Sequence, residues 1–232
     1  MIRLYVEADL AAGSLVEATE RQAHYLTGVM RRGIGSSVQL FNGRDGEWDG
    51  HIASTPRGRA IITVGTLARP QSADADLWLM FAVLKRDATD LVVQKATELG
   101  VSALWPVFTE RTNAARVNLD RLRAIGIEAA EQSERLTIPD IRQAGPLNDG
   151  LADWPVERQL FVALERANVQ TLTPVSGPAG LLIGPEGGFG QHDLAALDAC
   201  RFVRRVSLGP RVLRAETAAI VGLALLQAYG WS

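Results

Sequence analysis

The chain has 232 residues, of which 47% are hydrophobic and 22% are charged, and its formal net charge is −2 at pH 7. This composition excludes a disordered chain and fits one large globular domain or two smaller ones. The single cysteine, Cys200, excludes a disulfide framework, and the three histidines lack the spacing of metal ligands. We therefore expect a cytoplasmic protein without a metal. The longest apolar runs fall well short of the ~20 residues that cross a bilayer, so no membrane segment is expected.

Residues 1–70 predict a small domain made mainly of short strands. Asn42-Gly43 and Asp45-Gly46 are hairpin signals between two of these strands. One helix is expected at Glu20–Met30, with Thr19 as its N-cap. Several short strands with turns between them indicate a small closed or half-closed β-barrel. The polar segment Ala68–Asp76 contains a proline and predicts a linker to a second domain. The expected strands are Ile2–Val6, Ser37–Phe41, Glu47–Ala53 and Arg59–Leu67.

From residue 75 onward the pattern alternates between strands and helices. Such alternation predicts an α/β domain with a mostly parallel sheet. The expected strands are Leu77–Leu84, Val101–Phe108, Gln159–Leu164, Ala179–Gly184 and Phe202–Leu208. The expected helices are Asp87–Leu99, Leu119–Arg135, Asp193–Cys200 and Ala215–Tyr229. The last of these helices is apolar around most of its circumference, so we expect it to be buried on more than one side.

The sharpest chemical signal is a glycine-rich loop that follows a buried strand, Leu181-Leu182-Ile183-Gly184-Pro185-Glu186-Gly187-Gly188-Phe189-Gly190. Glycines permit positive φ angles and a close approach of the backbone to a ligand. Ligands of open α/β sheets bind beyond the carboxyl ends of the strands. The loop has neither the lysine of a Walker loop nor the spacing of a dinucleotide-binding motif. Two interpretations stay open, a ligand-binding loop and a tight strand-to-helix turn.

Charged residues mark the ends of two further strands. Glu216 near the start of the last helix is explained by the helix dipole, but Arg214 at the same place opposes that dipole. We therefore expect Arg214 to have an anionic partner, either inside the protein or a phosphate. Lys85 and Arg86 follow another strand. Polar residues at 131–135 are typical of a solvated helix face.

Taken together, the motifs resemble the RsmE-type ribosomal RNA uridine-N3 methyltransferases, which belong to the SPOUT, or trefoil-knot, superfamily. The resemblance extends over nearly the whole chain and departs from the family at Gly190, where Ser is common. That departure affects the cap of the following helix. The motifs that carry the resemblance are Gly184–Gly188, Leu208-Gly209, Leu213–Ala218, Gln94–Val101, Glu131–Ser133 with Arg135, Thr109–Arg111 and, more weakly, His24–Leu26, Val29–Arg31 and Leu40–Gly43.

The resemblance implies an α/β protein with two domains. Residues 1–70 would form a PUA-like β-barrel that docks RNA, and residues 75–232 a knotted SPOUT methyltransferase domain. The protein would be an obligate homodimer that uses S-adenosyl-L-methionine and methylates N3 of uridine 1498 in 16S rRNA of the small ribosomal subunit. Three loops would hold the cofactor through Leu164, Ile183, Gly184, Gly187, Gly188, Leu208, Gly209 and Leu213.

Methyl transfer to uridine N3 requires alignment of donor and acceptor and the loss of a proton from N3. Glu186 and Glu216 are the candidate bases or orienting groups, and Arg214 is the candidate that stabilises the anion. Which residue takes which role stays open. RNA contacts are expected from Arg31, Arg32, Arg111 and Arg135, although Glu98, Arg111 and Arg135 could build the dimer interface instead.

Three other functions remain open. The first is a knotted methyltransferase that acts on tRNA, on a ribose 2′-OH or on another rRNA site. The second is a non-catalytic RNA-binding factor in ribosome assembly. The third is a nucleotide- or phosphate-binding α/β protein, against which the missing Walker lysine counts.

Overall fold

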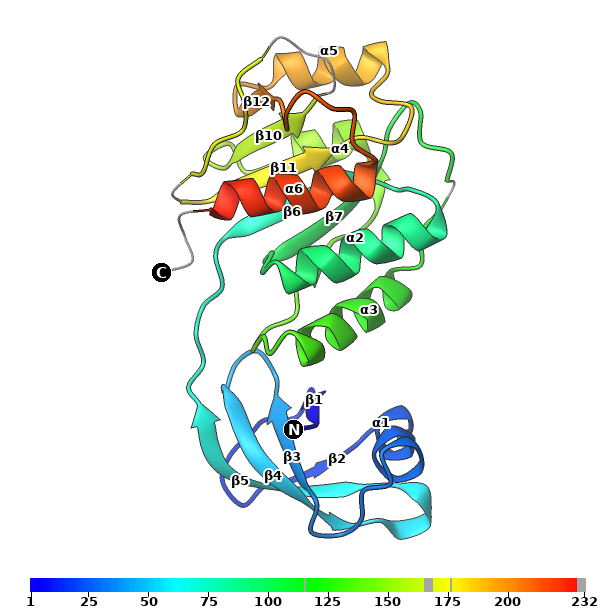
Figure 1. Ribbon diagram of the computed structural model, residues 1–232, viewed down its shortest axis with the longest axis vertical. Coiled ribbons are helices and arrows are strands. Elements are labelled where there is room, and N and C mark those ends of the chain that lie inside the picture. Colours follow the sequence, from blue (N-terminus) through cyan, green and yellow to red (C-terminus); the bar gives the residue numbers. More distant parts are fainter. Residues whose placement is uncertain (115, 165–168, 176, 229–232) are drawn as a thin grey trace. The chain divides into compact units, whose positions relative to one another are not determined.

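A computed structural model describes residues 1–114, 116–164, 169–175 and 177–228, and the chain divides into two compact units (Figure 1). Unit 1 comprises Met1–Ala73 with Ala130–Ile138, and unit 2 comprises Asp74–Ala129 with Pro139–Ser232. Each unit has its own sheet and its own hydrophobic core. In the described part of the chain, no helix has the length and apolar character that crossing a bilayer requires.

Unit 1 contains a five-stranded sheet in the order β1-β3-β4-β5-β2. Strand β1 runs parallel to β3, and the other neighbours are antiparallel. Alternate residues of β3 and β5, among them Val38, Leu40, Ile62 and Val64, are buried in one core because successive side chains of a strand point to opposite faces. The strands are β1 (Arg3–Tyr5), β2 (Leu15–Glu17), β3 (Ser37–Phe41), β4 (Glu47–Ser54) and β5 (Ile61–Arg69).

The helix expected at Glu20–Met30 forms as two consecutive parts. The α-helix α1 (Glu20–His24) continues directly into the π-helix η1 (Tyr25–Val29). The predicted N-cap is confirmed, because the Thr19 hydroxyl accepts a hydrogen bond from the Gln22 backbone N–H at 3.3 Å. A short 3₁₀-helix, η2 (Pro56–Gly58), joins β4 to β5.

Unit 2 contains a parallel sheet in the order β12-β10-β11-β6-β7-β8, with β9 also paired to β7. The predicted parallel α/β sheet is therefore confirmed. Of its strands, the two short ones, β8 and β9, were not predicted. The strands are β6 (Leu77–Ala82), β7 (Ala103–Phe108), β8 (Asp140–Ile141), β9 (Gly145–Pro146), β10 (Gln159–Ala163), β11 (Ala179–Ile183) and β12 (Val203–Val206).

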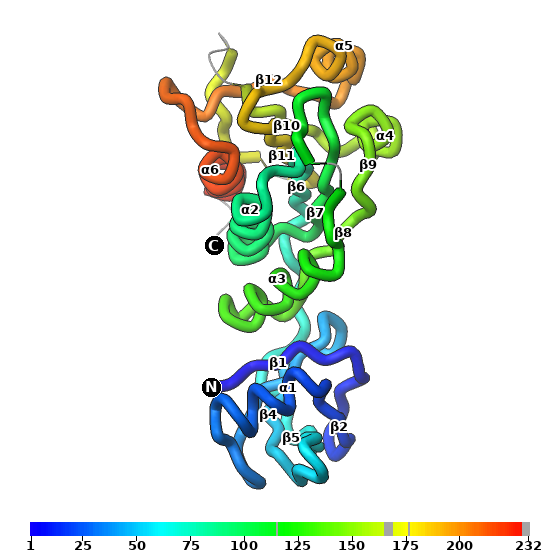
Figure 2. Tube along the Cα trace, turned by 90° about the vertical axis from the view of Figure 1, so that its right-hand side faces the viewer, coloured from blue at the N-terminus to red at the C-terminus, as the bar shows by residue number. Residues whose placement is uncertain are grey.

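Helices cover both faces of this sheet (Figure 2). Helices α2 and α6 pack on one face with Leu79, Phe81 and Leu181, whereas α4 and α5 pack on the other with Met80 and Leu182. Helix α6 ends at Gln227 rather than at the predicted Tyr229, which lies outside the described residues. The helices are α2 (Arg86–Glu98), α3 (Leu119–Gln132), α4 (Leu147–Ala152), α5 (Gln191–Ala199) and α6 (Ala215–Gln227).

The segment Ala130–Ile138 belongs to unit 1, although the sequence places it in a domain of residues 75–232. The cause is Arg3, which is 7% exposed. Its guanidinium donates hydrogen bonds to the backbone oxygens of Ala130, Glu131 and Arg135 at 2.8, 2.9 and 2.7 Å. These carbonyl groups lie at and just beyond the end of α3, where carbonyls lack helical partners and carry partial negative charge. Arg3 also stacks on the Phe41 ring at 4.5 Å.

Glu47 completes this cluster and makes the folding of unit 1 sensitive to acid. Its buried carboxylate accepts hydrogen bonds from Arg3 and Arg69 at 2.5 and 2.7 Å. Burial alone would raise the pKa of Glu47, but these two hydrogen bonds outweigh burial and hold the pKa below its ordinary value of 4.5. The folded state therefore binds this proton more weakly than the unfolded state does. The resulting stabilisation is present above pH 4.5 and is lost as the pH falls further.

We predict that Glu47→Gln lowers the free energy of unfolding at pH 7 by about 3–5 kcal/mol, because it leaves the buried guanidinium of Arg3 without its anionic partner. The variant should also lose less stability than the wild type between pH 5 and pH 3. Urea unfolding at a series of pH values measures both effects. An identical pH dependence in the two proteins would contradict the role assigned to Glu47.

Candidate functional site

Residues from the starts of three loops line a cavity at the carboxyl edge of the parallel sheet of unit 2. These loops follow β10, β11 and β12, whose carboxyl ends meet at one edge because the strands are parallel. The cavity, here called the loop cavity, has a volume of about 550 Å³. Of the predicted cofactor-binding residues, Gly187 is absent from its walls. Those that line it are Leu164, Ile183, Gly184, Gly188, Leu208, Gly209 and Leu213.

The loop after β11 is held in a defined shape by its own residues and by Arg111. A Cβ at Gly184 would stand 2.8 Å from the Phe189 ring, so only glycine fits there. Gly188 has a φ of 68°, in the left-handed region that favours glycine, and its N–H donates to the Pro185 oxygen at 2.9 Å. The Arg111 guanidinium donates to the Gly187 oxygen at 2.8 Å. Arg111 therefore positions this loop.

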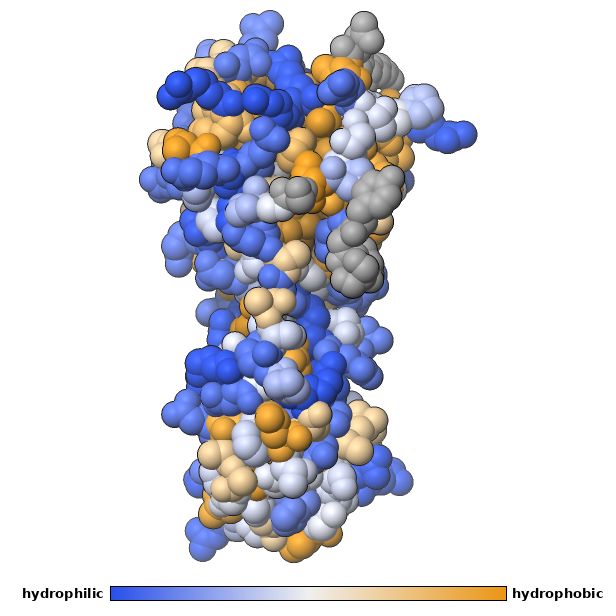
Figure 3. All heavy atoms as spheres, turned by 90° about the vertical axis from the view of Figure 1, so that its left-hand side faces the viewer, coloured by the Kyte–Doolittle hydropathy of each residue, from blue (hydrophilic) through white to orange (hydrophobic). Residues whose placement is uncertain are grey.

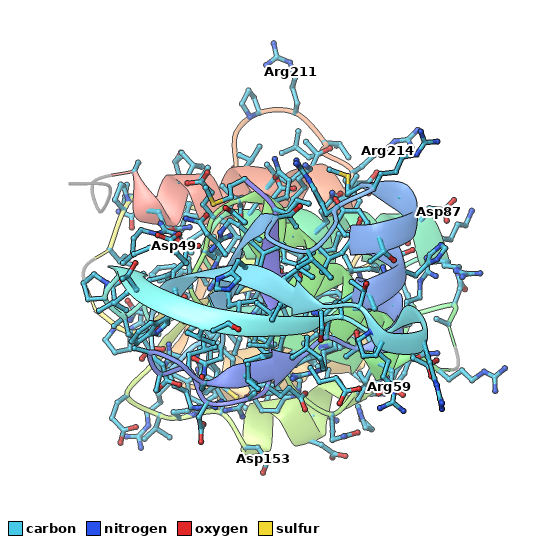
Figure 4. All side chains as sticks on the ribbon, turned by 90° about the horizontal axis from the view of Figure 1, so that it is seen from below. Asp49, Arg59, Asp87, Asp153, Arg211 and Arg214 are labelled. Carbon is cyan, nitrogen blue, oxygen red and sulfur yellow. The ribbon has the colours of Figure 1, made fainter. Side chains whose placement is uncertain are left out.

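The three candidate catalytic residues have different surroundings. Glu186 is exposed at the tip of the loop after β11, and Arg214 is the N-cap residue of α6; both line the loop cavity. Glu216 lies in the first turn of α6 and lines neither this cavity nor the second one described below. Arg211 and Arg214 project outward from the chain (Figure 4). Arg214 forms no ion pair with any residue that the structure describes. Among these residues it therefore lacks the internal anionic partner that the sequence analysis considered.

Two acids fix the start of α5: Asp193 within the helix and Glu110, which lies far away in the sequence. The Asp193 carboxylate, 6% exposed, accepts hydrogen bonds from the backbone N–H of Gly190 at 2.9 Å and of Glu110 at 3.1 Å. The Glu110 carboxylate accepts from the His192 N–H at 3.2 Å and so supplies the acceptor that an N-cap side chain would provide. A Cβ at Gly190 would collide with the Glu110 carboxylate. This collision explains why glycine stands at position 190. The absence of the usual serine there was the sequence signal that another residue, Glu110, caps α5.

The four residues predicted to bind RNA are not equivalent. Arg31 and Arg32 are exposed after η1, and Arg31 has a left-handed φ of 50°. Arg111 is exposed but bonds to the loop after β11. Arg135 is 9% exposed, and its guanidinium donates to the Thr137 hydroxyl at 3.0 Å. This buried guanidinium offers little surface to an RNA backbone, and an RNA contact by Arg135 stays a prediction.

A second cavity in unit 2, of about 890 Å³, is here called the basic cavity. Its walls come from the end of β6 and the start of α2, from Asn113, Ala114 and Arg116–Asn118, from the start of α3, and from Glu186. Lys85 and Arg86 are noticeable in the sequence as charges after a strand. The sequence does not show that they share a cavity with Arg116 and Arg121. In the described residues, no group of three or more His, Cys, Asp or Glu side chains could hold a metal ion.

We predict that Gly190→Ser and Glu110→Gly rescue each other. Gly190→Ser alone should cost about 1–3 kcal/mol of stability because of the collision with Glu110. Glu110→Gly alone should cost about 1 kcal/mol because α5 loses its cap acceptor. Glycine is needed at 110, since the Glu110 Cβ itself lies only 2.8 Å from a Cβ at 190. In the double variant the serine can cap α5 without collision, and urea unfolding should recover most of the loss. Additive losses would refute this coupling.

Comparison with known proteins identifies the family. Residues 71–227 match the RNA methyltransferase domain and residues 18–65 the RNA methyltransferase PUA domain. The chain is 31% identical to Ribosomal RNA small subunit methyltransferase E of Rickettsia conorii over 98% of this chain and 96% of that protein. The corresponding Neisseria gonorrhoeae enzyme, solved bound to S-adenosyl methionine, gives a TM-score of 0.89 at 26% identity, covering 98% of this chain and 97% of that one. A Legionella pneumophila structure with the cofactor SAM bound gives 0.87 at 29% identity, covering 98% and 97%. The chain belongs to the ribosomal RNA small subunit methyltransferase E family.

Proposed function

We propose that this protein uses S-adenosyl-L-methionine to methylate N3 of uridine 1498 in 16S rRNA of the small ribosomal subunit, in the cytoplasm. Membership of the family and the cofactor seen in two related structures support the proposal. The observation that carries it is the loop cavity, which lies where open α/β sheets bind ligands and has a carboxylate, Glu186, at its edge.

The residues of the loop cavity fit this cofactor. Its volume of about 550 Å³ lies within the usual range for small-molecule sites. Apolar side chains, among them Leu164 and Leu213, would hold the adenosine part, and the backbone at Gly188 and Gly209 permits close approach. Arg211 lines the same cavity, which suits the carboxylate of the amino-acid part. When bound, S-adenosylmethionine supplies a methyl carbon on a positively charged sulfur, and that sulfur leaves with the electron pair of the broken bond.

The residues of this chain have to prepare the acceptor nitrogen. Uridine N3 carries a proton, and its lone pair forms the new carbon–nitrogen bond only if that proton is removed. Glu186 is the base in this proposal, since its carboxylate is exposed at the loop cavity. Arg214 stabilises the negative charge that develops on the uracil ring, because it lines the same cavity without an ion-pair partner among the described residues. Glu216 serves the helix dipole of α6 rather than the reaction.

Methyl transfer to unmethylated small subunits tests this function. With labelled cofactor, wild-type protein should methylate one uridine at N3. We predict that Gly188→Val abolishes cofactor binding by calorimetry, and transfer with it, because a β-branched residue does not adopt a φ of 68°. Gly187→Ala is the control and should keep both activities, since its Cβ would meet Arg111 only at 3.7 Å. Absence of transfer by the wild type, or methylation of tRNA or of another rRNA site instead, would overturn the proposal.

The division of labour between the domains is part of the proposal. Residues 1–70 dock RNA, supported by the PUA-domain match and by the exposed Arg31 and Arg32. Phosphate contacts of this kind set affinity and salt dependence rather than sequence choice. Residues 75–232 carry out the transfer and follow a knotted path. A knot is supported by the course of the chain after β12, which returns from the edge of the sheet to pack α6 against β11 and α2.

The enzyme is proposed to act as a homodimer that buries part of α6. Ile220 and Val221 on this helix are only half-buried and join none of the hydrophobic clusters of the described residues. Val212, just before the helix, is 53% exposed. On one face of the molecule, apolar side chains reach the surface of unit 2 between charged ones (Figure 3). An apolar helix that is not covered within its own chain favours a partner.

Light scattering tests this assembly. At micromolar concentration, wild-type protein should have a mass of about 50 kDa, twice the 25.0 kDa of one chain. We predict that Val221→Glu shifts the protein toward the monomer, because it places a charge in the apolar contact. Leu15→Glu, at an exposed apolar residue of unit 1, is the matched control and should leave the mass unchanged. A monomeric wild type would refute the dimer.

A further inference from the structure

The basic cavity has the size and the lining of a nucleotide site. Its volume of about 890 Å³ lies in the range of ligand sites. Val83, Leu84 and Leu122 give it buried apolar walls. Asn113 and Asn118 are exposed on the same cavity, and their side-chain amides can both donate and accept hydrogen bonds. The apolar walls suit the flat faces of a nucleobase, and the amide groups beside them suit its polar edge.

The cationic side chains of this cavity differ in whether they have an anionic partner. Arg121 is committed, because it forms an ion pair with Asp90, which raises the pKa of Arg121 further. Lys85, Arg86 and Arg116 are exposed, and their side chains form no hydrogen bond or ion pair with the residues that the structure describes. Three free cations around one cavity attract a polyanion such as the backbone of RNA.

Glu186 belongs to both cavities. Within the described chain it is the residue that the walls of the loop cavity and of the basic cavity share. Methyl transfer requires the reacting atoms of donor and acceptor to meet at about 3–3.5 Å. A uracil ring that receives the methyl group from a cofactor in the loop cavity must therefore occupy an adjoining space. The basic cavity adjoins it at Glu186, the carboxylate assigned to remove the proton.

We propose that the basic cavity binds the target nucleotide, with Lys85, Arg86 and Arg116 on the RNA phosphates around it and the base directed toward Glu186. This inference rests on the proposed function and adds the place of the substrate. Because N3 lies on the pairing edge of uracil, the nucleotide must enter unpaired, as in other enzymes that modify bases. Lys85, Arg86 and Arg116 thus act as positioning residues, whereas Glu186 contacts the reacting base.

The test compares Lys85→Ala, Arg86→Ala, Arg116→Ala and their triple combination with the wild type. Each single variant should raise the KM for unmethylated small subunits about tenfold and leave kcat within about twofold, since phosphate contacts set binding. The slope of log(kcat/KM) against log salt concentration should become less negative by about one for each side chain removed. Arg116→Lys should recover most of the loss. Cofactor affinity by calorimetry should not change, because none of the three residues lines the loop cavity.

Arg201→Ala is the matched control, since Arg201 is an exposed arginine of unit 2 outside both cavities. An RNA fragment with 4-thiouridine at the target position gives a readout that does not depend on activity. Its ultraviolet crosslink should map to residues 83–90 or 113–122 and disappear in the triple variant. If the wild type crosslinks there but transfers no methyl group, the site stands and the proposed function fails. If transfer is normal while KM, salt slope and crosslink are unaffected in the triple variant, the basic cavity is not the acceptor site. Absence of both transfer and crosslink overturns both.

Discussion

The parallel sheet of unit 2 imposes the constraint on which the site depends. Parallel strands end at the same edge, so Leu164 and the loops after β11 and β12 converge although the ends of β10 and β12, at Ala163 and Val206, lie far apart in the sequence. The same edge receives the end of β6, which brings Lys85 and Arg86 close to Glu186. Two adjoining cavities follow from this arrangement, and a single carboxylate lies where they meet. The strand direction therefore brings together the two spaces that we propose for the methyl donor and for its acceptor.

A second layer of residues keeps that edge in a fixed shape. Arg111 bonds to the backbone of the glycine-rich loop, while the neighbouring Glu110 caps α5 and fills the space that a side chain at Gly190 would need. These two adjacent residues hold the part of the segment that follows Glu186, at Gly187 and at the start of α5. Sites are accurate when their supporting contacts are made by rigid elements. The loop is short and is anchored directly after Glu186, which suits a reaction that depends on alignment.

The sequence predicted the architecture better than the roles of individual charged residues. Periodicity and turn signals suffice for the parallel sheet and for the Thr19 cap, because both are local patterns. They do not reveal that Arg135 is buried or that Arg111 bonds to Gly187, since these facts depend on partners dozens of residues away. The basic cavity was missed for the same reason: Lys85 and Arg116 become neighbours only through the packing of α2 and α3. Short elements such as β8 carry too few residues for any period to show.

The guanidinium of Arg3 has a consequence for how the chain is made. Its acceptor on Arg135 lies 132 residues further along the sequence. A ribosome releases the chain from the N-terminus, so residues 1–73 emerge while this charge still lacks the carbonyl groups that surround it in the finished protein. Closing so long a loop costs entropy before the contacts form. The first domain is therefore completed only after more than half of the polypeptide has left the ribosome, when α2, β7 and most of α3 of the following segment have already been made.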